Sequence, residues 1–405
     1  MDSALLRPWQ VSIRRVTGPF LAMVSLVAFR ATAQTERPAS PAPEGSWRFI
    51  VSGDSRNCGD VVMPAIAAHS KQFDPKFYWH LGDLRAIYGI DEDMAAAAET
   101  SGESLSCQSY HRRAWSDFVE NQIAPFGDTP FYLGIGNHEV VPPKNEEAFK
   151  RQFQDFLDTP ALRRQRRVDG ESPEPQTYFH WVQGGVDFIY LDNANNFFSE
   201  AQLAWFFRRL NNALNAPQIK SLVVGMHEAL PDSIANGHSM GENPDPRARL
   251  TGITVYNALR DFNKNKPKGA PDKPIYVLAS HSHFYLANIF ETAKRKESGE
   301  KPLPGWIAGT AGAERYPLPD GVSPSPTAIP DTYGYLLGTV AADGTIAFAF
   351  QPLTQSDVPP MVKQRYPADF IPWCFDKNSR NKPRDPRVGA VRCPPPTPDA
   401  DRASE

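Results

Sequence analysis

Residues that commonly bind metal ions follow five short apolar runs along the chain. These are Gly53-Asp54, Gly82-Asp83, Gly136-Asn137-His138, Met226-His227 and Ser280-His281-Ser282-His283. Carboxylate and amide oxygens combined with imidazoles suit hydrolytic metals such as Fe, Mn and Zn. Two such ions about 3.5–4 Å apart can activate water, neutralise a phosphate and stabilise its leaving oxygen. The ordered set therefore predicts a shared metal site of the kind that a two-metal hydrolase needs.

The apolar runs are predicted to be strands that position these side chains. Trp47–Val51, Phe77–Leu81 and Phe131–Ile135 are rich in aromatic and β-branched residues, which is typical of strands. Val61–Phe73, between the first two, has helical spacing. A β-α-β unit implies a parallel sheet. Ligands of such sheets bind beyond the carboxyl ends of the strands, so we expect the polar residues to meet there.

Further elements are expected on both sides of the histidine motifs. Glycine pairs and Asp-Gly between apolar runs predict hairpins, and apolar spacing predicts helices. The expected hairpins are 178–182 with 186–191 and 335–340 with 346–350, and the expected helices include 203–214, two within 91–125, and one through Phe149, Phe153 and Phe156 that ends near Pro160. Residues 222–224 and 275–278 are expected to be buried strands before the histidines. From Pro352 onward, a Pro-rich stretch without periodicity predicts an extended segment.

The series of motifs resembles the calcineurin-like metallophosphoesterase family, with a purple acid phosphatase-like branch as one candidate. The family pattern is D-x-H, G-D, G-N-H-[DE], H and G-H-x-H, and the resemblance runs from about Trp47 to Ala313. It implies an α/β fold in which a two-sheet β-sandwich is flanked by helices (αββα). The late hairpin at 335–350 is then expected in the second sheet.

The same resemblance implies two divalent or mixed-valence metal ions, of Fe, Mn or Zn. One ion would take Asp54, Asp83 and His283, and the other would take Asp83, Asn137, His227 and His281, with Asp83 as the bridge. His138 would face the phosphate and its leaving group, where a cationic imidazole can donate a proton. Alternate residues of a strand point to opposite faces. His281 and His283 can therefore reach one metal pair only if the strand has already ended.

Arg56 departs from the family pattern, which has a histidine ligand two residues after the first aspartate. A guanidinium group does not ligate metal ions. Ala86 occupies the place of a tyrosine ligand in some purple acid phosphatases, so that substitute is missing too. We expect Arg56 to hold the substrate phosphate through its planar fork, or else to turn away and pair with a carboxylate. The first metal would be bound more weakly or selectively, completed by water or Asn57.

The loop Gly309–Ala313 follows the last histidines and a short predicted strand. Its backbone N–H groups are expected either to approach the phosphate or to form a tight turn between strands. It matches no dinucleotide-binding or P-loop motif.

Composition and the N-terminus predict an exported globular protein of 405 residues. The formal net charge of −3 and the absence of a dense basic run argue against nucleic-acid binding. Arg7, Arg14 and Arg15 precede the apolar run Pro19–Phe29 and a small-residue cleavage site, which predicts a signal peptide over residues 1–33. The arginine pair also loosely matches a twin-arginine signal. The run is shorter than the ~20 residues of a membrane span, so no stable anchor is expected.

The predicted organisation after the signal peptide is a Pro-rich linker at 34–45, a catalytic domain at 46–355 and a Pro-rich C-terminal tail at 356–405. A secreted or periplasmic location permits disulfides. The chain has four cysteines, and of three pairings we expect the one that closes the shortest loops: Cys58–Cys107 and Cys374–Cys393.

The sequence thus predicts a metal-dependent phosphoric ester hydrolase acting on a phosphorylated small molecule, with a phosphate monoester as the expected substrate. Two alternatives stay open. One is a phosphodiesterase acting on nucleotides or lipid head groups, since the loops rather than the metal core decide this preference. The other is a non-catalytic member that binds a phosphorylated ligand, which only the altered first motif supports. The sequence does not identify the substrate, the metals or the oligomeric state.

Overall fold

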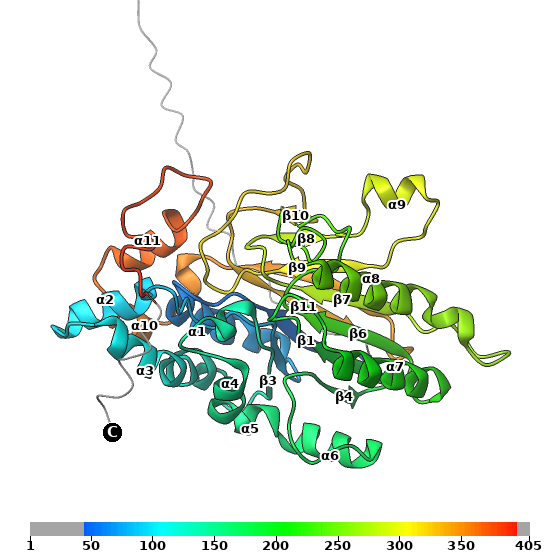
Figure 1. The fold of residues 1–405 in the computed structure, drawn as a ribbon. Coiled ribbons are helices and arrows are strands. Elements are labelled where there is room, and N and C mark those ends of the chain that lie inside the picture. The colour runs from blue at the N-terminus through cyan, green and yellow to red at the C-terminus, as the bar shows by residue number, and fades with distance from the viewer. Residues whose placement is uncertain (1–43, 236, 395–405) are drawn as a thin grey trace, which may run out of the picture. The chain divides into compact units, whose positions relative to one another are not determined.

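The computed structural model describes residues 44–235 and 237–394 and contains two β-sheets (Figure 1). The predicted signal peptide and nearly all of the predicted linker lie outside these residues. The first sheet has the order β12-β11-β1-β2-β3, with β1 (Trp47–Ser52), β2 (Tyr78–His80), β3 (Phe131–Leu133), β11 (Gly334–Val340) and β12 (Ile346–Pro352). The second has the order β10-β8-β9-β7-β6-β5-β4, with β4 (Phe179–Gln183), β5 (Val186–Leu191), β6 (Ser221–Met226), β7 (Ile275–Ala279), β8 (Tyr285–Ala287), β9 (Gly305–Ala308) and β10 (Ala328–Ile329).

The first sheet is parallel at its centre. β1, β2 and β3 pair in parallel, and helix α1 (Gly59–Ser70) connects the first two, which confirms the predicted β-α-β unit. The late hairpin β11-β12 forms as predicted, but its placement in the second sheet was wrong. β11 pairs antiparallel along β1, from Trp47 opposite Val340 to Val51 opposite Leu336. The hairpin pattern specifies that two strands pair with each other, and it carries no information about which sheet edge receives them.

The second sheet carries the histidine strands. β5, β6, β7 and β9 are parallel, and the predicted hairpin β4-β5 closes one edge. Alternate residues of β5 face opposite sides: Phe188 and Tyr190 belong to the core between the sheets, whereas Ile189 and Leu191 belong to the core beneath the outer helices. Both faces are thus buried, which explains why Phe188–Leu191 carries no charged residue.

Aromatic side chains fill the space between the sheets. Phe49 of β1 lies 5.0 Å from Phe188 of β5, and Trp79 of β2 lies 5.2 Å from Trp181 of β4, measured between ring centroids. Both contacts are edge-to-face, the geometry that aromatic quadrupoles favour. These contacts across the sandwich fix the two sheets against each other at the level of the strands that precede the metal-ligand motifs.

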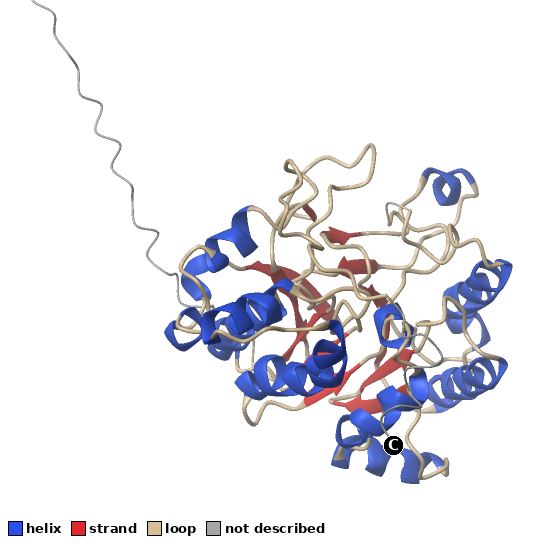
Figure 2. Cartoon of the chain, turned by 60° about the vertical axis from the view of Figure 1, so that its left-hand side comes forward, coloured by secondary structure: helices blue, strands red, loops and turns tan. Residues whose placement is uncertain are grey.

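Helices lie on both outer sides of the strands (Figure 2). The remaining α-helices are α2 (Glu92–Ser101), α3 (Cys107–Phe118), α4 (Glu146–Gln152), α5 (Gln154–Leu157), α6 (Pro160–Asp169), α7 (Glu200–Asn215), α8 (Pro246–Asp261), α9 (Ala293–Glu297), α10 (Pro360–Lys363) and α11 (Phe370–Asp376). Short 3₁₀ or π turns are η1 (Lys71–Phe73), η2 (Val119–Ile123), η3 (Ala124–Phe126), η4 (Asn137–Val140), η5 (Phe262–Asn265) and η6 (Gln355–Asp357). The residues of α7 and α8 that are buried pack on the second sheet. Within the described ranges, no helix is long and apolar enough to cross a membrane.

The predicted helix through Phe149, Phe153 and Phe156 is broken. α4 ends at Gln152, α5 is a separate short helix, and α6 begins at Pro160 rather than ending there. Thr159 caps α6 by accepting a hydrogen bond from the backbone N–H of Leu162. Proline is favoured in the first turn of a helix, so Pro160 starts this helix.

The C-terminal segment differs from the extended form that we expected. It forms α10 and α11, and Phe370, Trp373 and Cys374 are buried in the core of the first sheet. The predicted disulfide pairing was also wrong: the bonds are Cys58–Cys374 and Cys107–Cys393. Short loops are entropically easy to close, but here the C-terminal segment packs back on α1 and α3. Proximity in the fold therefore decides the pairing.

Candidate metal centre

The predicted ligand residues all follow the carboxyl ends of parallel strands, and the fold brings them together at one edge. Asp54 follows β1, Asp83 follows β2, and Asn137 begins η4 after β3. His227 follows β6, and the His281–His283 pair follows β7. We call Asp54, Asp83 and His283 the first ligand group, and Asp83, Asn137, His227 and His281 the second ligand group.

Left-handed backbone turns aim several of these side chains inward. Asp54, Asp83 and His281 have φ values of 61°, 61° and 65°. Such values cost energy for residues other than glycine and persist where the surrounding structure enforces them, often at functional sites. The turn at His281 also means that β7 has ended at Ala279. His281 and His283 therefore escape strand alternation, and both reach the site.

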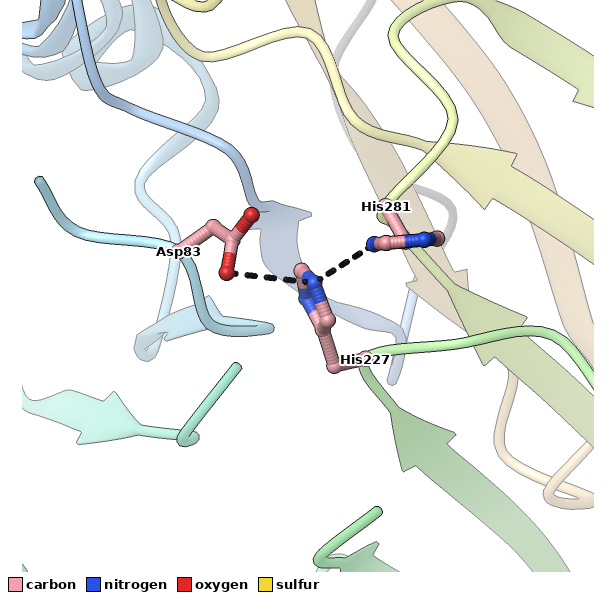
Figure 3. A group of neighbouring side chains, drawn as sticks. All are labelled: Asp83, His227 and His281. Carbon is pink, nitrogen blue, oxygen red and sulfur yellow. Dashed lines mark hydrogen bonds and ion pairs between the residues drawn. The ribbon is translucent and has the colours of Figure 1, made fainter. Parts of the chain in front are cut away.

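The second ligand group converges on one imidazole nitrogen. Nε2 of His227 lies 3.0 Å from Oδ1 of Asn137, 3.1 Å from Nδ1 of His281 and 3.2 Å from Oδ1 of Asp83. Figure 3 shows Asp83, His227 and His281 arranged around this point. The opposite ring nitrogen, Nδ1 of His227, lies 3.0 Å from the carbonyl oxygen of Leu81, to which it donates its hydrogen.

Four atoms of types that commonly bind metal ions therefore meet at one point. A proton on Nε2 of His227 can serve only one of its three neighbours, whereas a metal ion can bind all four atoms. Burial lowers the pKa of His227, but the charges of Asp83, Asp54 and Glu139 outweigh burial and raise it to about 9. The site thus carries excess negative charge that favours a cation. The second ligand group fits a metal ion with mixed O and N ligands.

Glu139 braces the loops that hold this group, a role that the sequence did not reveal. Its carboxylate accepts hydrogen bonds from the backbone N–H groups of Asp83 (2.9 Å), Leu84 (2.9 Å) and Gly136 (2.8 Å). These bonds join the loop after β2 to the loop after β3. Gly136 is required there because a Cβ atom would lie 2.4 Å from Oδ1 of Asp83.

The first ligand group has a different environment, because Arg56 points into it rather than away. Nη2 of Arg56 donates to Nε2 of His283 at 2.9 Å, Nη1 donates to the Tyr88 hydroxyl at 2.8 Å, and Nε lies 3.8 Å from Oδ2 of Asp83. Nδ1 of His283 donates to the Glu314 carbonyl oxygen at 2.7 Å, so Nε2 is free to accept.

The buried Arg56 keeps its charge. Its side chain is almost fully enclosed, and burial would lower its pKa, but the neighbouring Tyr88 and Asp83 raise the pKa above its ordinary value. Burial and then the charge of Arg56 lower the pKa of His283. The pair is thus a cationic guanidinium against a neutral imidazole.

His138 lies beside the site but is not cationic. Burial, followed by the Arg56 charge, lowers the pKa of His138 to about 4, so the imidazole is neutral at neutral pH. Its Nδ1 donates to the Ala86 carbonyl oxygen at 2.7 Å, and Nε2 lies 3.6 Å from Oδ2 of Asp83. Nε2 of His138 therefore remains free and lies toward the carboxylate of Asp83.

Two backbone amides of the loop Gly309–Ala313 are engaged in hydrogen bonds within the protein. The N–H of Ala311 donates to the carbonyl oxygen of Gly53 at 3.0 Å, and that of Ala313 donates to the carbonyl oxygen of Asp54 at 2.9 Å. A Cβ atom on Gly309 would lie 2.7 Å from Oδ2 of Asp54. The loop therefore supports the turn that carries Asp54.

A pocket of about 370 Å³ opens onto Arg56 and His283. Its wall combines the loop around Tyr88, the residues Glu314 and Tyr316, and the C-terminal segment, which contributes Ser379, Arg380, Lys382, Arg384 and Arg392. The Arg380 guanidinium lies 3.9 Å from the Tyr316 ring centroid and pairs with Glu314 at 2.9 Å. The sequence did not reveal the C-terminal residues of this wall, since they lie far along the chain from the predicted ligand residues and belong to no motif.

Comparison with known proteins identifies solved structures that are similar to this fold. No protein-family model matches the chain, and no curated protein does. Among solved structures, a purple acid phosphatase from yellow lupin (Lupinus luteus) seeds is similar over 77% of this chain, with 14% identity and a TM-score of 0.50. The chain has a metallophosphoesterase fold. This confirms the predicted α/β two-sheet fold flanked by helices.

Two further solved structures align with most of this chain at TM-scores below 0.5. A structure of PhoD matches 78% of this chain and 73% of its own, with 17% identity and a TM-score of 0.44. A putative 5'-nucleotidase from Staphylococcus aureus matches 76% of this chain and 54% of its own, with 14% identity and a TM-score of 0.39. The chain covers 52% of the length of the purple acid phosphatase.

Proposed function

We propose that this protein is an exported, metal-dependent phosphoesterase that hydrolyses phosphate monoesters of small molecules. The observation that carries the proposal is the convergence of the Asp83, Asn137 and His281 ligand atoms on Nε2 of His227, 3.0–3.2 Å away, beside a charged Arg56. A metal ion bound there would polarise the phosphate and lower the pKa of a water molecule.

The chain's own residues would position the substrate. Arg56 presents its guanidinium at the base of the pocket, where it can donate to a phosphate oxygen. His138 has a bare Nε2 that can accept a proton from water or, once protonated, return it to the leaving oxygen. Asp83 receives a hydrogen bond from the backbone N–H of His138 at 3.0 Å, which fixes the carboxylate between both ligand groups.

The pocket favours a monoester over a diester. Arg56, Arg380 and Arg384 contribute positive charge to it. A terminal phosphate monoester carries up to two negative charges and a diester carries one, so the cationic wall favours the monoester.

Export is supported by the two disulfides, which are typical of proteins outside a reducing cytosol. Together with the predicted signal peptide, they favour a secreted or periplasmic site of action.

Chelation tests the proposal. Exhaustive removal of metal should abolish hydrolysis of an aryl phosphate, and added Mn²⁺, Zn²⁺ or Fe²⁺ should restore it. A parallel bis-aryl phosphodiester should be hydrolysed at least about tenfold more slowly. Full activity in a sample shown to be free of metal would refute metal dependence, and a reversed preference would establish the phosphodiesterase alternative.

A further inference from the structure

We propose that this metal centre holds one metal ion, in the second ligand group, and that the guanidinium of Arg56 takes the place of the other ion. The inference rests on the proposed function, since it assigns the charges of the same site. It departs from the two-ion centre that the family resemblance implies.

The two ligand groups differ in what satisfies their lone pairs. In the second group, Oδ1 of Asn137, Nδ1 of His281 and Oδ1 of Asp83 lie 3.0–3.2 Å from Nε2 of His227, and within the described residues none of these atoms accepts a hydrogen bond from an arginine or lysine. In the first group, the lone pair of His283 Nε2 already accepts a hydrogen bond from Nη2 of Arg56 at 2.9 Å. One lone pair cannot bind a metal ion and accept this hydrogen bond at the same time.

The distances show that a metal ion and Arg56 would compete for Nε2 of His283. A metal ion binds an imidazole nitrogen at about 2.0–2.1 Å, while Nη2 sits 2.9 Å from that nitrogen. An ion on the His283 lone pair would overlap the guanidinium. Oδ1 of Asp54 lies 3.2 Å from the same Nε2, so an ion shared by Asp54 and His283 would have to lie beside the guanidinium of Arg56.

Arg56 is also held in this position from its other side. Nη1 donates to the Tyr88 hydroxyl at 2.8 Å, and the side chain is 7% exposed. Tyr88 in turn lies on a loop that pairs with the C-terminal segment: the Cys393 N–H donates to the Tyr88 carbonyl oxygen at 2.8 Å. Arg56 therefore does not swing freely between the pocket and solvent.

The charges of the site also argue against a second divalent ion. Asp54 and Asp83 supply two negative charges, and Arg56 supplies one positive charge. One divalent ion then leaves a net charge of +1 before substrate binds, whereas two divalent ions would leave +3 around a buried guanidinium. Repulsion between like charges increases as the surroundings become less polar, so the second divalent ion is disfavoured by the arginine that occupies its site.

Metal stoichiometry tests the proposal without relying on activity. The purified chain is loaded with excess Mn²⁺, freed of unbound ions by gel filtration, and analysed for metal per chain, with electron paramagnetic resonance as a second readout. We expect one ion per chain and the spectrum of isolated Mn²⁺. Two ions with exchange-coupled Mn²⁺ would overturn the inference, and so would the absence of bound metal.

His281 and His283 form a matched pair of variants, because they lie two residues apart in one loop. His281→Ala should weaken metal binding at least tenfold, while His283→Ala should leave one ion bound with nearly the parent affinity. Equal losses in the two variants would contradict the inference. Circular dichroism confirms that both are folded before metal is measured.

Arg56→His supplies a converse test, since it removes the cation and restores an imidazole at the family ligand position. We expect this variant to bind up to two ions, and Arg56→Met, which removes the cation without adding a ligand, to show weaker binding of any second ion. The outcomes also separate this inference from the proposed function. Two ions with metal-dependent hydrolysis would refute only the inference, and one ion without hydrolysis of any phosphate ester would refute only the function.

Discussion

At the scale of single residues, the sequence predicted some features of the site and not others. Asp83 and His227 lie next to each other as expected, and their order among the motifs, rather than either residue alone, predicted this. The sequence showed that Arg56 departs from the family pattern. Whether its side chain points into the site or away from it became clear only from its contacts with Tyr88 and His283. Neither did the sequence predict the neutral state of His138, because burial and the Arg56 charge cause it.

Replacing Arg56 by alanine should reduce kcat/KM for an aryl phosphate by about tenfold to a hundredfold, which corresponds to the roughly 1.5–3 kcal/mol of a hydrogen bond to a charged group. The loss follows because Arg56 is the cation nearest to His283 at the base of the pocket. Steady-state kinetics measure the effect, and inorganic phosphate inhibition measures phosphate affinity separately. Phosphate affinity equal to that of the parent would show that Arg56 does not contact the phosphate.

Replacing Glu139 by glutamine should weaken metal binding by about tenfold to a hundredfold, the usual effect of losing a partner that orients a ligand. The amide nitrogen of glutamine would face the backbone N–H groups of Asp83, Leu84 or Gly136, and at least one of them would lose its acceptor. Competition with a fluorescent chelator measures the affinity. Glu103→Gln is the control, because Glu103 is exposed and pairs with Arg113. A similar loss of metal affinity in this control would contradict the role given to Glu139.

Elements of regular structure were predictable where their pattern is local. The spacing of apolar residues predicted the β-α-β unit and both hairpins, because these elements pair with their neighbours in sequence. The prediction of the sheet to which β11 and β12 belong was wrong, because that sheet is set by pairing between β1 and a strand almost 300 residues away. The helix break at Phe153 depends on tertiary packing of the phenylalanines, which a helical period cannot express.

An ion-pair network joins β4, β5 and α6 and should give the fold a pH dependence. Nδ1 of His180 lies 2.8 Å from Asp187, and Nε2 lies 2.7 Å from Asp169. Burial would lower the pKa of His180, but the charges of Asp187 and Asp169 raise it to about 9. A histidine with a raised folded pKa stabilises the fold fully below the unfolded pKa of about 6.5. This contribution disappears as pH rises through about 9.

The free energy of unfolding should therefore fall by up to about 1.4 kcal/mol per pH unit between about pH 6.5 and pH 9 through His180 alone. Urea unfolding of the parent and of His180→Gln over this range measures the contribution as the difference between the two proteins. The variant should be less stable at pH 6.5 and converge toward the parent near pH 9.5. His69→Gln, outside the network, should run parallel to the parent, and a parallel His180→Gln curve would exclude the linkage.

At the scale of the whole molecule, the C-terminal segment is the part whose structure the sequence did not predict. This segment forms α10 and α11, supplies basic residues to the pocket, and is tied by disulfides to residues 316 and 286 positions earlier in the chain. The pairing could not be predicted from loop length, because length in sequence measures the entropy of closure and not the distance between cysteines in the folded chain.

Removing the second disulfide in Cys107→Ser with Cys393→Ser should lower the free energy of unfolding by about 2–5 kcal/mol. It should also raise KM more than it lowers kcat, because Cys393 pairs with the backbone of Tyr88, and Tyr88 holds Arg56. Urea unfolding and steady-state kinetics give the two readouts. Metal content should stay at the parent level, and a matching loss of metal would mean that the disulfide supports the ligand loops themselves.

The long-range disulfides have a consequence for the order in which the chain becomes covalently complete. During synthesis, Cys58 and Cys107 emerge well before Cys374 and Cys393. The first two cysteines can only pair with each other until the last part of the chain arrives, and that pair is not native. In the refolding of the full chain, the shorter Cys58–Cys107 loop is easier to close than either native loop, so we expect oxidative refolding to pass through a Cys58–Cys107 species that requires thiol–disulfide exchange. A disulfide isomerase should accelerate recovery of the native bonds, and acid-trapped intermediates mapped by peptide mass should contain this early bridge.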